Sequence, residues 1–455
     1  MTARPVVADF YVESQKVSKR RILYINFSFP PMSVPGIWRA LSFTKYLVQF
    51  GYDVTVLCAD RSWNNTYDET LLVDMPPKMR IKRLKSISLA DILQKMEHVA
   101  RKSRFRLLSK ILEGMEWRIA RLYPEPNFLW CFKATLAGVF LALSRRIDCV
   151  ITSGPPHICH IPGLMISKCT RVPWIMDYRD LWTDDPDLSP QSGYQKRLFQ
   201  VIEAYATRHA DAVTTVSPGW QRHLKSRFSG TTKSDRFFLI RNGHNLDKFT
   251  FEYHNGPHYD GRLHIHFNGT LQILAKTTSV LDALYKLRSD DIRGGTLPIV
   301  TFTGIDDLFM KEIRSRNLED IILDVGYMTY YQSIMYSLSC DVLLIIVNND
   351  NPSRWGTIPR KTYEYMALGR HILAVVPFES DVRELLKEYG NATVCDVDDP
   401  DDICNALMKL ITLHGEHKLN TNLDVGKREM ALEKYSMEHH TRQLISLIEA
   451  LPKKK

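Results

Sequence analysis

The sequence predicts an α/β protein made of two successive domains, each with a parallel sheet and flanking helices. Three observations support this class. The chain has 455 residues, which is more than one hydrophobic core usually organises. Short apolar runs alternate with helical patterns along both halves of the chain. Loops of glycine, proline and polar residues follow several of these runs, at the place where open α/β sheets bind ligands.

The predicted elements of the first domain begin after a polar tail at residues 1–19. In order they are strand Arg21–Asn26, helix Ile37–Phe50, strand Val54–Cys58, strand Cys149–Thr152, helix Ile158–Cys169, strand Pro173–Asp177, helix Tyr194–His209, strand Ala212–Val216, helix Pro218–Phe228 and strand Phe238–Arg241.

The loop after the first predicted strand, FSFPPMSVPG, is the first candidate ligand-binding element. Gly36 lies where the loop meets the helix, so that the backbone there is able to approach an anionic ligand closely. Arg39, one turn into the helix, is placed to reach the same ligand. The alternative is a tight turn with a solvated Arg39.

Charged residues gather after the predicted strand Pro173–Asp177, in the run DYRDLWTDD. Asp177, Arg179 and Asp180 are candidates for a binding site at the carboxyl end of this strand. They would serve equally well as an internal ion-pair network that shapes the loop. His157, Cys159 and His160 suggest a metal site, but no second cluster of ligands lies at a useful spacing, and we expect no metal.

The second domain follows a polar linker and repeats the alternation. Its predicted elements are strand Leu263–Phe267, strand Pro298–Phe302, helix Asp306–Arg316, strand Ile321–Val325, helix Tyr330–Ser339, strand Asp341–Val347, helix Pro359–Gly369, strand Ile372–Val376, helix Ser380–Tyr389, strand Ala392–Cys395, helix Pro400–His414 and a last helix over Gly426–Leu451. The domain plan is therefore a tail (1–19), a first domain (20–245), a linker (246–262), a second domain (263–425) and a C-terminal segment (426–455).

The stretch NNDNPSRWGTIPRKTYEYMALGRHILAVV is the clearest strand–loop–helix–strand unit of the chain. Proline suits the start of its helix and glycine suits the residue after its end. The helix N-terminus favours phosphate, and Arg360 and Lys361 add two cations. Glu364 shares a face with Lys361, and its carboxylate suits a pair of sugar hydroxyls. The alternative is a surface ion pair between Lys361 and Glu364.

The net charge of +9 is concentrated in one segment. Lys78–Arg121 contains 13 Lys/Arg and 4 Asp/Glu, with apolar residues at helical spacing. This combination is typical of helices that lie on an anionic membrane surface. A basic lid over an anionic substrate and a solvated charged face are the alternatives. The segment has few interleaved aromatic residues, so we expect no nucleic-acid partner.

The remaining composition predicts a soluble, cytoplasmic protein that binds the inner face of the cell membrane peripherally. The eight cysteines include no CxxC pair, and we expect reduced thiols. The longest apolar run, Ala134–Leu143, is far shorter than the about 20 residues that span a bilayer.

Taken in order, the motifs of this chain resemble the family 4 glycosyltransferases of the GT-B fold over nearly its whole length. The motifs are PPMSVPGIWR, VITSGPPH, PWIMDYRDLW, IRNGHNLDKF, FNGTL with Lys276, and GTIPRKTYEYMALGRHILAVV. The resemblance implies two Rossmann-like, doubly wound domains that face a central cleft. It also implies a retaining, hexosyl-type transfer of a sugar from a nucleotide diphosphate, without metal or another cofactor.

The resemblance assigns roles to individual residues. Glu364 would bind the donor ribose, Lys276 would neutralise the diphosphate, and Tyr327 lies where the family places the nucleobase. The remaining candidates for the donor site are Gly36, Arg39, Gly269, Thr270, Ile358 and Lys361. The candidate catalytic residues are Lys276, Asp180 and His157. The acceptor would be a glycan, a lipid-linked sugar or a surface polysaccharide precursor.

Two positions depart from the family pattern. The family often carries a glutamate eight residues before the ribose-binding one, and this chain has Gly356 there. The usual arginine after the first glycine of the second domain is Thr270. A catalytically silent GT-B subunit that binds a partner enzyme at the membrane is the alternative function, and a sugar-nucleotide epimerase fits the motifs less well.

Overall fold

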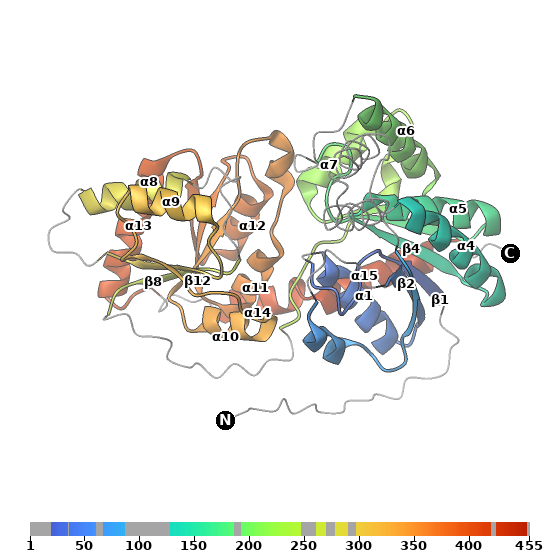
Figure 1. Ribbon diagram of the computed structural model, residues 1–455, viewed down its shortest axis with the longest axis horizontal. Helices are drawn as coiled ribbons and strands as arrows, with labels where there is room; N and C mark the ends of the chain where they lie inside the picture. Colours follow the sequence, from blue (N-terminus) through green and yellow to red (C-terminus); the bar gives the residue numbers. More distant parts are fainter. Residues whose placement is uncertain are drawn as a thin grey trace, which may run out of the picture.

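The computed structural model describes residues 20–34, 36–60, 67–86, 128–185, 193–246, 261–269, 278–289, 297–419 and 425–452. The predicted tail (1–19), most of the linker, and residues 87–121 of the basic segment lie outside these ranges. The described residues form two α/β domains that lie side by side along the longest axis of the molecule (Figure 1).

The first domain has a seven-stranded sheet in which all neighbouring strands are parallel, in the order β3-β2-β1-β4-β5-β6-β7. The strands are β1 (Arg21–Ile25), β2 (Asp53–Ala59), β3 (Arg80–Leu84), β4 (Cys149–Gly154), β5 (Trp174–Tyr178), β6 (Ala212–Thr215) and β7 (Phe237–Leu239). This is the doubly wound order, in which the direction of winding reverses between β1 and β4.

The helices of the first domain cover both faces of this sheet. They are α1 (Ile37–Gln49), α4 (Phe128–Ser144), α5 (His160–Thr170), α6 (Gly193–His209) and α7 (Pro218–Arg227), with short 3-10 turns at Glu69–Asp74, His157–Cys159 and Ser234–Arg236. Side chains of α1 pack on one face, and those of α4 to α7 pack on the other.

Two of these elements were not predicted. Residues 80–84 of the basic segment form the edge strand β3, and charged side chains such as Arg80 and Lys82 suit the exposed edge of a sheet. Helix α4 is apolar on most of its circumference, and its pattern therefore lacks the period of an amphipathic helix.

The second domain has a six-stranded parallel sheet in the order β10-β9-β8-β11-β12-β13. Its strands are β8 (His264–Phe267), β9 (Ile299–Phe302), β10 (Ile322–Asp324), β11 (Val342–Ile346), β12 (His371–Val376) and β13 (Ala392–Asp396). Its helices are α8 (Thr278–Ser289), α9 (Asp307–Ser315), α10 (Tyr330–Leu338), α11 (Arg360–Leu368), α12 (Asp381–Tyr389) and α13 (Pro400–Gly415), with a 3-10 turn at Pro352–Gly356. The winding reverses between β8 and β11, so ligands are expected at the loops that follow these two strands.

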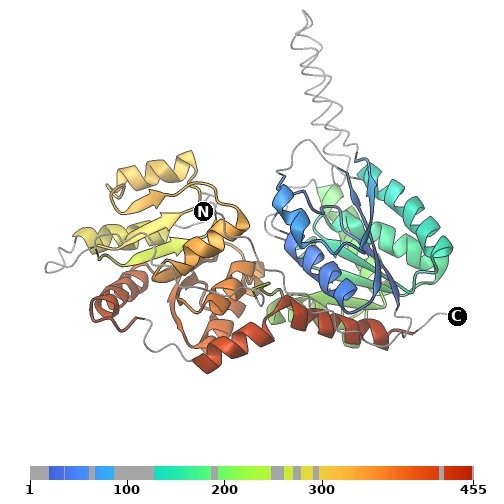
Figure 2. The ribbon, with the colours of Figure 1, turned by 90° about the horizontal axis from the view of Figure 1, so that it is seen from below.

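The C-terminal segment crosses back to the first domain, as Figure 2 shows for the red helices along its lower side. The predicted single helix is two helices, α14 (Val425–Lys434) and α15 (Met437–Ala450). Ser436 divides them because its side chain accepts a hydrogen bond from the His439 amide and caps α15. Helix α15 packs on α1, and the Arg20 guanidinium donates to the carbonyl groups of Glu449 and Leu451 at 3.0 Å.

The predicted NGHN motif forms the junction at which this crossing is held. The His244 amide donates to the Tyr435 carbonyl at 3.1 Å, and the Met437 amide donates to the His244 carbonyl at 2.9 Å. Gly243 faces the same backbone, and a side chain there would collide with the Tyr435 carbonyl. The chain therefore passes between the domains twice at one place, and the two passages are hydrogen-bonded to each other.

Candidate active site

The loop and helix that follow β11 hold the central candidate residue, Glu364. Helix α11 ends at Gly369, whose left-handed φ of 73° closes the helix as predicted. The side chain of Glu364 is buried, and Tyr330 at the start of α10 donates a hydrogen bond to its Oε1 at 2.9 Å. Burial and the nearby Glu364 raise the pKa of Tyr330 well above its usual value, so the phenol keeps its proton.

The ion pair of Glu364 is formed with Arg360 rather than with the predicted partner, Lys361. Arg360 lies one full turn before Glu364, and its guanidinium contacts the same Oε1 atom. The contact with Lys361 is not formed because its amine points elsewhere: it lies 3.6 Å from the centre of the Phe267 ring. Of the described residues, none donates a hydrogen bond to Oε2 of Glu364.

Lys361 lies instead beside Gly269, the second residue of the loop that follows β8. A methyl group at Gly269 would lie 3.0 Å from the Lys361 amine, and the φ of 152° at Gly269 also favours glycine. Burial lowers the pKa of Lys361 from 10.5 to about 7, and the charge of Glu364 opposes this only in part. The structure thus brings two of the predicted donor-site residues together at the point where the winding reverses.

Other predicted residues of the second domain differ in exposure. Tyr327, in the loop after β10, is 80% exposed, so its ring is open to a planar ligand. Ile358 is buried in the core of the domain, so only its backbone is placed to meet a ligand. Thr270 and Lys276 lie in residues 270–277, outside the described part of the chain.

Arg39 of the first domain does not reach out to a ligand, which corrects the prediction, and it is not solvated either. Its guanidinium is buried and pairs with Asp177 through Nη2–Oδ1 at 2.8 Å and Nε–Oδ2 at 3.0 Å. It also donates to the carbonyl groups of Ile240 and Arg241. Burial by itself would raise the pKa of Asp177, but the charge and hydrogen bonds of Arg39 hold it below its usual value.

Arg179 connects three loops and fills the space beside Gly36, which explains why position 36 requires glycine. Its guanidinium donates to the carbonyl groups of Gly36, Gly154 and Pro155. A side chain at Gly36 would collide with that guanidinium. Gly36 therefore lies at the start of α1 as predicted, and Arg179 occupies the space beside it. Asp180, the next residue, is half-buried at the end of β5.

His157 is buried in a chain of hydrogen bonds. The Trp174 indole donates to Thr152 at 2.8 Å, Thr152 lies 2.9 Å from His160 Nδ1, and His157 Nε2 lies 3.0 Å from the Leu181 carbonyl. Burial lowers the pKa of both histidines, that of His160 to about 3. Both rings are therefore neutral at ordinary pH. In this conformation the hydrogen bonds of His157 hold the surrounding loops together. Among the described residues no cluster has the composition of a metal site.

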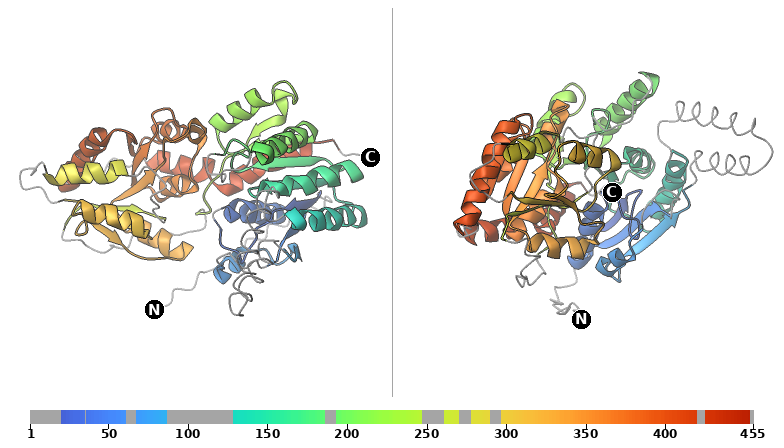
Figure 3. Two further views of the ribbon diagram at one scale, coloured as in Figure 1. Left: turned by 45° about the horizontal axis from the view of Figure 1, so that its top comes forward. Right: turned by 60° about the vertical axis from the view of Figure 1, so that its left-hand side comes forward.

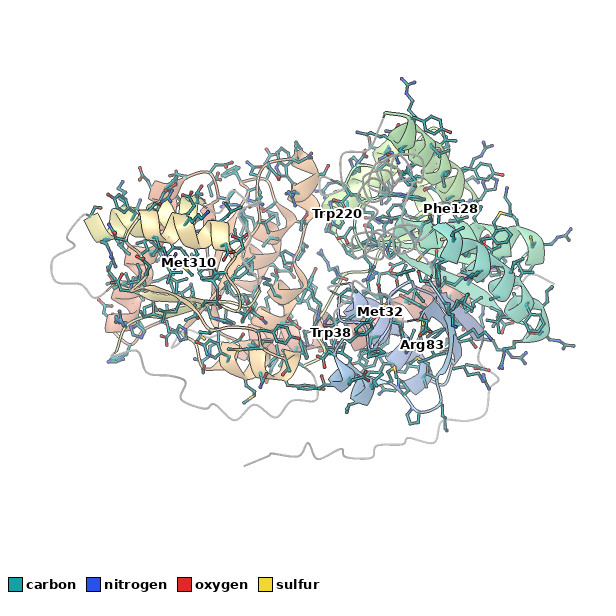
Figure 4. All side chains as sticks on the ribbon, viewed as in Figure 1. Met32, Trp38, Arg83, Phe128, Trp220 and Met310 are labelled. Carbon is teal, nitrogen blue, oxygen red and sulfur yellow. The ribbon has the colours of Figure 1, made fainter. Side chains whose placement is uncertain are left out.

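Three aromatic residues that the sequence analysis did not select connect the two domains. Trp38 of α1 lies 4.3 Å from Tyr330, measured between ring centres, and the Arg360 guanidinium lies 4.5 Å from the centre of the Trp38 ring. Trp220 of α7 donates from its indole to the Ser353 carbonyl at 2.8 Å. Figure 4 places Trp38 and Trp220 where the first domain faces the second. The WR pair of the first motif contained Trp38, but nothing in the local pattern indicated its partner.

These contacts define which ends of the sheets face each other. In the first domain they come from the segments that follow β1 and β6, and in the second from those that follow β10 and β11. Ligand-binding loops of parallel sheets lie at carboxyl ends, so the candidate site lies where the carboxyl ends of the two sheets meet. Figure 3 shows the two domains on either side of this boundary.

Comparisons with known proteins found similarity both in sequence and in structure. Residues 36–243 match the family model described as a glycosyl transferase 4-like domain. A search of curated proteins found no significant match. Among solved structures, a glycosyltransferase from Rickettsia africae superposes with a TM-score of 0.63 at 12% identity, covering 95% of this chain and 98% of that one.

Two further structures widen the comparison. The Anabaena protein HepE, solved in complex with UDP-glucose, has a TM-score of 0.59 at 13% identity, with 95% of this chain and 100% of that one covered. A putative UDP-N-acetylglucosamine 2-epimerase from Listeria monocytogenes has a TM-score of 0.53 at 10% identity, with 95% and 96% covered. The predicted fold class is confirmed: the chain has the GT-B fold. Residues 36–243 of its first domain match the model of a glycosyl transferase 4-like domain, and together these findings support a glycosyltransferase of the GT-B type.

Proposed function

We propose that the chain transfers a sugar from a nucleoside diphosphate sugar to an acceptor, with retention of configuration and without a bound metal ion. The observation that carries this proposal is the placement of Lys361 beside Gly269, at the carboxyl end of β8, with Glu364 one turn farther along α11. A cation and a carboxylate one turn apart match a ligand that joins a phosphate to a diol.

In this proposal Glu364 takes the ribose. Its Oε1 is engaged by Tyr330 and Arg360, which fixes the carboxylate in one orientation. Oε2 then accepts from a ribose hydroxyl, and Tyr327 offers an exposed ring to the base. The complex of the Anabaena neighbour with UDP-glucose supports a nucleotide-sugar donor as the ligand class.

Lys361 takes the diphosphate. Breaking the bond between the sugar and the phosphate leaves negative charge on the departing diphosphate, and a positioned cation stabilises that charge. The amide groups at the start of α11 add the positive end of a helix dipole. Lys276, in the undescribed part of the neighbouring loop, is proposed as a second cation. Protein cations in this number provide an alternative to a metal ion.

The first domain is proposed to hold the acceptor, a glycan, a lipid-linked sugar or a polysaccharide precursor. A lipid-linked acceptor would be met at the inner face of a membrane, to which the basic segment Lys78–Arg121 is proposed to bind. None of the described helices is both long and apolar enough to cross a bilayer.

A panel of UDP-, GDP- and ADP-linked sugars tests the proposal, with binding followed by thermal shift and calorimetry. Glu364→Gln is expected to weaken binding of the preferred donor at least about tenfold, which corresponds to about 1.4 kcal/mol. Glu384→Gln is the matched control, because Glu384 is an exposed helical glutamate in an ion pair with Lys387. Equal effects of the two changes would contradict the assignment of Glu364.

Turnover of the preferred donor separates the functions. A glycosyltransferase releases the nucleoside diphosphate in the presence of an acceptor, an epimerase converts one nucleotide sugar into another, and a silent subunit does neither. Product stereochemistry, read by NMR, tests retention. Loss of turnover in EDTA that magnesium restores would contradict metal independence.

A further inference from the structure

The outer face of α4 is an exposed apolar stripe. Five of its large apolar side chains follow one another at spacings of three or four residues, which places them on one face of the helix. They are Leu129, Phe132, Leu136, Phe140 and Leu143, and the last four of them are 61–70% exposed. The opposite face, with Trp130, Ala134 and Gly138, is buried against the sheet. A helix that is apolar on both faces is typical of one that is covered on both.

Cations border this stripe on one side. A hollow of about 730 Å³ lies between α4 and the edge strand β3. Of the nine residues that line it, three are cations (Arg80, Lys82 and Arg145), none is a carboxylate, and Phe140 belongs to the stripe. Arg80 is paired with Asp53, so Lys82 and Arg145 carry most of the uncompensated charge.

The stripe also has a direction relative to the candidate site. Helix α4 leads into β4 and therefore begins at the carboxyl edge of the sheet. Its first turn contacts the residues after β1, since Trp130 lies 5.1 Å from Phe27 between ring centres, and Cys131 contacts the carbonyl of Ile158. Figure 4 shows Phe128, the first residue of α4, farther from the second domain than Trp38. The stripe thus runs from the edge that carries the ligand-binding loops toward Arg145.

We propose that this face of α4, with Lys82 and Arg145 beside it, is a docking surface for an anionic lipid bilayer. The aromatic and leucine side chains enter the interface between headgroups and acyl chains, and the cations contact lipid phosphates. The inference deepens the proposed function, because a lipid-borne acceptor would then approach the carboxyl edge of the first sheet along α4. It rests on described residues alone, and Lys82 is the one residue of the basic segment that it uses.

A second copy of the chain is the competing occupant of an apolar helix face. The bordering charges favour a bilayer, because in a symmetric dimer formed through α4 the cations of one copy would face those of the other near the same stripe. An anionic bilayer offers both an apolar layer and phosphates of the opposite charge.

Vesicle flotation of the full-length chain tests the proposal. One set of phosphatidylcholine vesicles contains about 30% phosphatidylglycerol, which gives the surface a negative potential, and the other set contains none. Phe132→Gln/Leu136→Gln/Phe140→Gln is expected to lower the bound fraction on anionic vesicles at least about tenfold, and Lys82→Glu/Arg145→Glu at least about fivefold at physiological salt. Val201→Gln/Leu308→Gln/Phe378→Gln changes exposed apolar residues elsewhere, and Lys311→Glu/Lys409→Glu changes exposed lysines of the second domain; both controls are expected to bind as the wild type does.

A label on the stripe distinguishes the occupants. An environment-sensitive dye on Phe140→Cys, in a Cys169→Ser background because Cys169 is the exposed native thiol, is expected to shift to the blue with anionic vesicles. A dye on Phe378→Cys is expected not to shift. Wild-type binding by the stripe variant, or an unshifted dye at position 140, would overturn the proposal. So would a blue shift without vesicles that grows with protein concentration, since this indicates a dimer.

Donor binding keeps this test separate from that of the proposed function. All of the stripe and charge variants keep Glu364 and Lys361, so calorimetry with a soluble donor is expected to be unchanged. Loss of vesicle binding with retained donor binding supports the docking surface. Absence of donor binding in the wild type contradicts the proposed function, but it does not change what vesicle binding shows about the docking surface.

Discussion

The indole of Trp220, in the first domain, lies directly over Gly356, in the second. A Cβ atom at Gly356 would lie 2.7 Å from the indole nitrogen, which is closer than real contacts allow. The backbones approach each other at the same place, since a Cβ at Gly219 would lie 3.2 Å from Gly356 Cα. The Gly219 amide donates to Asp381 at 2.6 Å. Gly356 is therefore used for contact between the domains.

The first prediction concerns this contact. Gly356→Ala is expected to destabilise it by about 1–3 kcal/mol, because a methyl group overpacks the site. The domains are then expected to separate, which raises the radius of gyration measured by X-ray scattering. Trp220→Ala in the same chain removes the collision, so the double variant should lose less stability than the sum of the single changes. Gly230→Ala, at an open position, is the control. An unchanged radius of gyration and thermal midpoint for Gly356→Ala would refute the prediction.

The second prediction is a pH dependence of donor binding that belongs to Lys361. Its pKa of about 7 means that, in the chain without bound donor, the Lys361 amine loses its charge as the pH rises above 7. A bound diphosphate favours the charged form, so donor affinity should be greatest below pH 7 and fall about tenfold by pH 8.5. Calorimetry at several pH values, in buffers of different ionisation enthalpy, should detect proton uptake on binding above pH 7.

Lys361→Arg provides the matched control for this profile. The guanidinium stays charged at all of these pH values. Donor affinity should therefore become nearly independent of pH between about 6.5 and 8.5. The same slope in the wild type and in Lys361→Arg would assign the titration to another group.

The third prediction concerns the buried pair of Arg39 and Asp177. Because the pKa of Asp177 is lower in the folded chain than in the unfolded one, the unfolded chain takes up the proton first as the pH falls. The contribution of the pair to stability is thus complete above the unfolded pKa near 4 and is lost as the pH falls below it. Asp177→Asn leaves Arg39 buried without its counter-ion and should cost about 3–5 kcal/mol at pH 7.

Urea denaturation of the wild type and of Asp177→Asn, at neutral and acid pH, checks this prediction. The difference in the free energy of unfolding between the two proteins should become smaller as the pH falls. Asp53→Asn is the control, since Asp53 forms an exposed pair with Arg80 and exposed pairs contribute little. A difference that does not change with pH would show that Asp177 is not the titrating group.

The fourth prediction concerns the space beside Gly36. The φ of −78° at Gly36 is compatible with alanine, so any cost of Gly36→Ala comes from the collision with Arg179. We expect a loss of about 1–3 kcal/mol in the wild type and almost none in an Arg179→Ala background. Thermal unfolding of the four proteins closes this double-mutant cycle, and equal costs in the two backgrounds would contradict it.

The sequence by itself determined the two-domain α/β class and most of the elements. The unit from β11 to β12 was predicted to within a residue or two at each end, including the glycine that ends α11, because strand length, helix capping and turn residues are local properties. Resemblance in motif order also led to the GT-B fold. Hydrophobic periodicity did not predict β3, because charged residues occupy this edge strand. It did not predict α4 either, because this helix is apolar on its exposed face as well as on its buried one.

Only the tertiary structure decided which side chains meet. Arg39 and Asp177 are 138 residues apart, and they pair because β5 brings Asp177 close to α1 across the sheet. Lys361 and Glu364 share a helix face as predicted, yet Phe267 and Gly269 surround the lysine while Tyr330 and Arg360 engage the glutamate. Periodicity along the chain is set by local backbone geometry, whereas partners and pKa values are set by burial and by neighbours from distant strands, which no local pattern records.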